Sequence, residues 1–102
     1  LQHITKSDPK NLQIISVKGD SMHPTLHDDD LVMLDRSKTS LNYDGLFVLL
    51  YGDALHVKRI SRAPTQGRIV IISDNRSIYP PQEYAAEDVS VVGKVIWYGR
   101  KV

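Results

Sequence analysis

Short apolar segments rich in β-branched residues, separated by turn-forming residues, constrain the fold of this chain most strongly. No segment keeps a 3.6-residue hydrophobic period over three helical turns, so an amphipathic helix is not expected. The pattern predicts a mainly β fold, with several short, coiled antiparallel sheets and a partial barrel. The expected strands are residues 12–17, 31–35, 46–51, 54–60, 68–73 and 89–98.

The connections between these segments carry their own signals. Gly52-Asp53 separates two β-prone runs and predicts a hairpin. Asp29, in the acidic run 28–30, is expected to take a left-handed backbone conformation, which aspartate tolerates better than most residues. Pro24 suits a single helical turn, and Pro80-Pro81 predicts a stiff extended loop.

Composition limits the possible functions. At 102 residues the chain has the length of one domain, and its net charge of +1 gives no strong attraction to nucleic acid. It contains no cysteine, which excludes disulfides and thiolate chemistry. Its longest apolar run is about five residues, far short of the ~20 that span a bilayer, so no membrane partner is expected.

Ser21 and Lys58 are the candidate catalytic residues. Gly19 permits a sharp turn that presents Ser21, with backbone N–H groups facing a developing oxyanion. Lys58 lies among apolar residues, and burial there would lower its pKa enough for it to act as the base that serine needs. The alternative is that Ser21 caps a helical turn and Lys58 snorkels at the surface.

Several segments together resemble the LexA-type self-cleaving repressors, a group that includes UmuD and the C-terminal domains of many phage repressors. They are residues 17–32, which contain Gly-Asp-Ser-Met-His-Pro-Thr, and residues 57–60, 72–75 and 92–97. The resemblance implies that residues 12–102 form a peptidase-like regulatory and dimerisation domain. Residues 1–11 would be the remnant of an interdomain linker, with a helix-turn-helix DNA-binding domain upstream.

The resemblance also implies a role for each residue of the serine turn. Ser21 would be the nucleophile and Lys58 its neutral general base. The backbone N–H groups of Ser21 and Asp20 would stabilise the oxyanion. Gly19 and Met22 would support the site, Met22 by packing beside the turn, and no metal or other cofactor is implied.

His56 and the glycines depart from the family pattern. His56 stands where relatives often have threonine and shares a strand face with Lys58. If protonated it would lower the pKa of Lys58; alternatively it is a polar residue on a solvent-facing edge. The scissile Ala-Gly or Cys-Gly pair of the family is absent, because no glycine here follows alanine or cysteine.

The function implied by the resemblance is that of a cytoplasmic repressor domain of the SOS-response type. It would form a homodimer through an edge at Val95 and Trp97, although an indole more often fills a core. It would act as a Ser/Lys-dyad autoproteolytic endopeptidase on its own linker, induced by a RecA–single-stranded DNA filament or an antirepressor. DNA would be contacted only through the upstream domain. The alternative is a non-cleaving oligomerisation or effector-sensing module.

Overall fold

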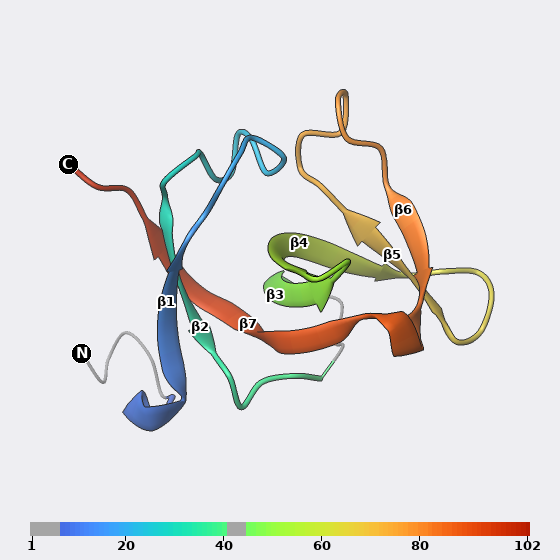
Figure 1. Cartoon of the computed structure of the whole chain (residues 1–102), viewed down its shortest axis with the longest axis horizontal. Helices are drawn as coiled ribbons and strands as arrows, with labels where there is room; N and C mark the ends of the chain where they lie inside the picture. The colour runs from blue at the N-terminus through green and yellow to red at the C-terminus, as the bar shows by residue number, and fades with distance from the viewer. Residues whose placement is uncertain (1–6, 41–44) are drawn as a thin grey trace.

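The computed structural model describes residues 7–40 and 45–102, and the strands of these residues form a single seven-stranded antiparallel sheet (Figure 1). In space the strands follow the order β1-β2-β7-β3-β4-β5-β6. Short 3₁₀ helices, η1 (Pro9–Asn11) and η2 (Ala86–Asp88), precede β1 and β7. The strands are β1 (Leu12–Ser16), β2 (Leu31–Asp35), β3 (Leu46–Tyr51), β4 (Ala54–Arg62), β5 (Arg68–Ile72), β6 (Gln82–Ala85) and β7 (Ser90–Gly99).

The predicted mainly β fold is confirmed, with differences in how the strands associate. They join into one continuous sheet rather than several, and within the described residues this sheet does not close into a barrel. The sequence pattern does not predict β6, because its four residues are too few and too polar to show a strand period. Residues 1–6 of the expected linker remnant lie outside the described residues.

β7 lies between β2 and β3 in the order of the sheet, but it has a partner on both sides over only part of its length. Only its first half, as far as Lys94, pairs with β3. Val95 and Trp97 lie in the second half, which pairs with β2 alone among the described strands. A strand's own sequence does not specify its neighbours, because these are chosen by long-range packing.

The hydrophobic core has two parts that share strand β3. Leu46 and Val48 point into one cluster, whereas Phe47 and Leu49 point into the other, as the period of a strand requires. This central strand is buried on both faces, which explains its unbroken apolar run. The first cluster comprises Val17, Met22, Leu26, Val32, Leu34, Leu46, Val48 and Val57, and the second comprises Phe47, Leu49, Ile60, Ile69 and Ile71.

Two loops meet above the sheet and bring distant parts of the chain together. The serine turn, residues 17–30 after β1, lies beside the bridging loop, residues 73–81 between β5 and β6 (Figure 1). Gly19 and Asp29 have φ angles of 84° and 69°, so the left-handed conformation expected at Asp29 is confirmed. The Gly19 N–H donates to Asp28 Oδ1 at 2.7 Å and closes the base of the turn.

Candidate active site

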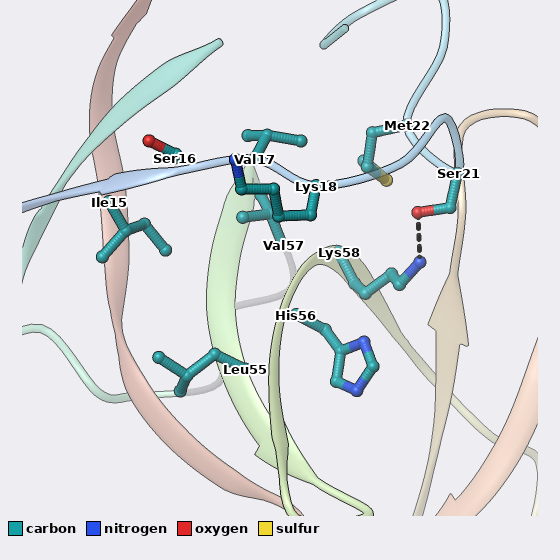
Figure 2. A pocket seen from close by; sticks show the side chains of 10 residues that line it. All are labelled: Ile15, Ser16, Val17, Lys18, Ser21, Met22, Leu55, His56, Val57 and Lys58. Atoms are coloured by element: carbon teal, nitrogen blue, oxygen red, sulfur yellow. Dashed lines mark hydrogen bonds between the residues drawn. The ribbon is translucent and has the colours of Figure 1, made fainter. Parts of the chain in front are cut away.

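Ser21 and Lys58, from separate parts of the chain, are in direct contact. Lys58 Nζ donates a hydrogen bond to Ser21 Oγ at 2.7 Å and another to Ser73 Oγ at 2.9 Å. Figure 2 shows the Lys58 side chain reaching from β4 toward the serine turn. Ser73 directly follows β5, the strand that pairs with β4. The contact between hydroxyl and amine therefore depends on the pairing of β4 with β5 and on the seating of the serine turn above them.

Lys58 is buried, with only 7% of its surface exposed. Burial lowers the pKa of Lys58 below its ordinary value of 10.5, while the negative charge of Asp74 opposes this shift. Within residues 7–40 and 45–102, no carboxylate forms an ion pair with this amine. The neutral form of Lys58, which is the form that accepts a proton, is therefore more populated than for a lysine in water.

Asp74 links the serine turn to the strand that carries Lys58. Its carboxylate accepts two hydrogen bonds from Arg59 and one, at 2.5 Å, from Thr25 Oγ1. Burial alone would raise the pKa of Asp74, but the hydrogen bonds from Arg59 and Thr25 outweigh it, and the pKa is lowered. Asp74 is thus a fixed negative charge close to the amine.

Further hydrogen bonds fasten the bridging loop to the serine turn. Asn75 donates from its backbone N–H to the Ser21 carbonyl at 3.0 Å and from Nδ2 to the Asp20 carbonyl at 3.1 Å. The hydroxyl of Tyr79 donates to Asp20 Oδ1 at 2.7 Å. Beneath the turn, Met22 is 1% exposed, and its sulfur accepts from the Asp74 N–H at 3.4 Å. The expected packing of Met22 beside the turn is therefore observed.

His56 is partly buried and stacks on Tyr51, with ring centroids 4.1 Å apart. Burial, and then the charge of Lys58, lower the pKa of His56 below its ordinary value of 6.5. A neutral imidazole cannot depress the Lys58 pKa by charge, and burial accounts for that shift instead. At His56, β4 pairs with β3 alone among the described strands, because its pairing with β5 begins at Arg59. His56 therefore lies at an open edge of β4, in agreement with the second expectation, although its side chain is partly buried.

The Ser21–Lys58 pair opens onto cavities on both sides. One, of about 250 Å³, lies between β1 and β4 and is lined by Ile15, Val17, Lys18 and Leu55 among others (Figure 2). The second, of about 360 Å³, is lined by Tyr51, Ile71, Ser73, Tyr79, Pro80 and Gln82. Ser21, His56 and Lys58 border both. An extended chain laid across the serine would therefore find space on either side of it.

The structure groups the predicted site residues in one place and the predicted dimer residues in another. Ser73 and Tyr79 are contacts that the sequence reasoning missed, and the only signal for them is the polar run that follows β5. No cluster of three or more potential metal ligands occurs among the described residues. Gly19, Asp20, Ser21, Met22, His56 and Lys58 gather at the serine turn, whereas Val95 and Trp97 line a separate cavity of about 420 Å³.

Comparison with known proteins assigns this arrangement to a family. A model of the Peptidase S24-like family matches residues 1–96. The chain belongs to the Peptidase S24-like family.

Relatives of this S24-like domain are regulators of transcription. It is 33% identical over 89 residues to the 26 kDa repressor protein of Escherichia phage HK022, covering 85% of this chain and 37% of that protein. It is 31% identical over 96 residues to the HTH-type transcriptional regulator PrtR of Pseudomonas aeruginosa, covering 89% of this chain and 37% of PrtR. An uncharacterised HTH-type regulator of Haemophilus influenzae is 28% identical over 95 residues. The chain spans less than two-fifths of the length of these curated relatives.

Proposed function

We propose that this S24-like domain is the C-terminal regulatory domain of a phage-type or LexA-like transcriptional repressor, and that Ser21 and Lys58 cut the linker to its DNA-binding domain. The observation that carries the proposal is the 2.7 Å contact between Lys58 Nζ and Ser21 Oγ at the border of two cavities. Burial of Lys58 supports its role as a base, since it favours the neutral amine. The similarity to a phage repressor supports the regulatory role.

The reaction follows from the chemistry of the two groups. Neutral Lys58 takes the hydroxyl proton of Ser21 as Oγ attacks the scissile carbonyl carbon. The oxyanion that forms accepts a hydrogen bond from the Ser21 backbone N–H. Lys58 then gives its proton to the departing amine as the C–N bond breaks, leaving an acyl ester on Ser21. Water hydrolyses this ester, with Lys58 again taking a proton, and restores the serine.

Dimerisation is the second part of the proposal. Trp97 is 43% exposed, so its indole does not fill the core. It borders the 420 Å³ cavity together with Leu46 and Val95. A large exposed aromatic beside an apolar hollow is typical of a protein interface. We place the partner copy on this surface, which reaches the serine turn at Thr25 but does not include Ser21 or Lys58.

The decisive experiment is mass spectrometry of the full-length protein that carries this domain. Wild type, Ser21→Ala and Lys58→Ala are incubated between about pH 7 and about pH 10, where lysine increasingly loses its proton. A RecA–single-stranded DNA filament is added in a parallel series. We expect a single cut upstream of the domain that grows with pH in wild type and is absent in both variants. Equal cutting in a variant would exclude the dyad.

An intact wild type in both series would favour the alternative of a non-cleaving oligomerisation module. The exposed Trp97 beside the 420 Å³ cavity favours this alternative, because it supports association without requiring a cut. The experiment distinguishes the self-cleaving domain from the non-cleaving module, because only the module is expected to dimerise with concentration and show no cut.

A further inference from the structure

Asn75 holds two successive peptide groups of the serine turn. Its Nδ2 donates to the Asp20 carbonyl at 3.1 Å, and its backbone N–H donates to the Ser21 carbonyl at 3.0 Å. The Asp20 carbonyl also accepts from the His23 N–H at 3.1 Å. The nucleophilic serine is therefore bracketed by two carbonyl groups whose directions are set by one residue of the bridging loop.

Because the peptide group is planar, the hydrogen bond that holds the Asp20 carbonyl also fixes the direction of the Ser21 N–H. The carbonyl of Asp20 and the N–H of Ser21 belong to the same planar trans peptide, so they point in opposite directions. Fixing the carbonyl toward Asn75 therefore fixes the Ser21 N–H away from Asn75. No hydrogen bond within residues 7–40 and 45–102 uses the Ser21 N–H, so this donor is free for an incoming oxygen.

Asn75 is itself held firmly in place. Its carbonyl accepts from the N–H groups of Ile78 and Tyr79, at 3.3 and 2.9 Å. Its Oδ1 accepts from Ser77 Oγ at 3.4 Å, which leaves Nδ2 directed at Asp20. On the other side of the contact, Tyr79 anchors the Asp20 carboxylate. Asn75 and the Asp20 residue that it contacts are thus both restrained before any substrate binds.

We propose that Asn75 is a positioning residue of the oxyanion site, acting by fixing the peptide between Asp20 and Ser21. The inference rests on the proposed function, since it needs a reaction that develops negative charge on an oxygen beside Ser21. It assigns Asn75 a role separate from that of the residues around Lys58. Asn75 acts on the donor that stabilises the oxyanion, whereas Ser73 and Asp74 act on the amine that takes the proton.

The test compares Asn75→Asp with wild type in the full-length protein. Aspartate keeps the shape of the side chain and the backbone N–H, but it places an acceptor where Nδ2 donates to the Asp20 carbonyl. We expect the plateau rate of self-cleavage to fall by about 10- to 100-fold, less than the 10²–10³ lost with a whole oxyanion donor. The pH midpoint of the rate is read from Asn75→Ala, which adds no charge, and it should stay within a few tenths of a unit because the charges and contacts of Lys58 are unchanged.

Ile78→Ala is the matched control in the same loop, since Ile78 is 62% exposed. It should cleave at the wild-type rate. Asn75→Ala provides a second variant that removes the donor without adding charge, and it should fall in plateau rate as Asn75→Asp does. Thermal unfolding of all three variants separates loss of positioning from loss of folding.

Acylation by a p-nitrophenyl ester gives a readout that does not require the linker. Wild type should release a nitrophenol burst that Ser21→Ala lacks and that both Asn75 variants slow. If wild type cleaves itself and both Asn75 variants cleave at the same rate, the inference about Asn75 is wrong, while the proposed function still stands. A shifted pH midpoint in Asn75→Ala, or unfolding of both variants, would also overturn it, because Asn75 would then act on Lys58 or on stability. A wild type with neither cleavage nor burst would overturn the proposed function as well.

Discussion

Both carboxylate oxygens of Asp74 accept hydrogen bonds from the guanidinium of Arg59, at 2.8 Å from Nε and 3.1 Å from Nη2. Arg59 is the chain neighbour of Lys58, so this ion pair fixes a negative charge close to the buried amine. The charge raises the pKa of Lys58, although burial has the larger effect and the net pKa is lowered. Asp74 therefore limits how far the lysine pKa falls.

Asp74→Asn should move the pH dependence of self-cleavage toward lower pH. Removing the carboxylate removes the interaction that raises the pKa of Lys58, and it leaves the positive charge of Arg59 unpaired nearby. The neutral amine then forms at lower pH. We expect a lower midpoint of the pH–rate profile together with a reduced plateau, since Thr25 also loses a charged partner. Initial rates measured across the pH range give both quantities.

Glu83→Gln is the control for this shift. Glu83 pairs with Arg68 on the paired strands β5 and β6, at the surface. It also removes one negative charge but does not contact the serine turn or Lys58. Its midpoint should match that of wild type, and an equal shift in the two variants would mean that Asp74 acts only through net charge.

Lys58→Met should stabilise the folded protein at neutral pH, by on the order of 1 kcal/mol, because a buried amine loses hydration on folding. The folded pKa of Lys58 lies below 10.5, so between these two values the unfolded chain binds more protons than the native one. Wild-type stability should therefore rise with pH through this window, and the advantage of methionine should shrink toward pH 10.5.

Urea unfolding of Lys58→Met and wild type at several pH values measures this difference. Lys10→Met serves as the control, because the Lys10 side chain is 79% exposed and its burial penalty is absent. A methionine advantage that grew with pH would contradict the assignment of a lowered lysine pKa.

Gly93→Ala should destabilise the sheet by about 1–3 kcal/mol, the usual cost of overpacking a core. A Cβ at Gly93 would lie 2.5 Å from the Asp35 carbonyl oxygen and 2.9 Å from Leu34 Cδ1. The first is a backbone atom of a paired strand, so it cannot move aside without disturbing β2. Thermal unfolding checks this, with exposed Ser90→Ala on the same strand as control. An unchanged melting temperature would show that β7 can shift.

Trp97→Asp should weaken the proposed dimer. Burying a carboxylate against the apolar rim of the 420 Å³ cavity would cost far more than burying the indole. Sedimentation velocity over a concentration series should show a monomer at concentrations where wild type is dimeric. Ile78→Asp also adds a charge at an exposed apolar site, but on the bridging loop, and should leave association unchanged. Dimerisation of both variants would place the interface elsewhere.

The sequence by itself determined the local features of this protein. Short apolar segments between turn-forming residues located most strands, Gly52-Asp53 located the hairpin of β3 and β4, and the backbone at Asp29 followed from residue type. These features depend on residues close together in the sequence, so they can be predicted without knowing how the rest of the chain folds. The turn at Gly19 and the apolar neighbours of Lys58 singled out Ser21 and Lys58, and the family resemblance, borne out by the Peptidase S24-like match, implied that the two act together.

Only the tertiary structure decided which distant groups meet. The placement of β7 between β2 and β3, the second hydrogen bond of Lys58 to Ser73, and the hydrogen bond of Asn75 to Asp20 all join segments far apart in sequence. His56 likewise owes its lowered pKa to burial and to Lys58. Pairing partners and burial arise from the packing of the whole sheet, and no local pattern encodes them because each depends on residues many positions away.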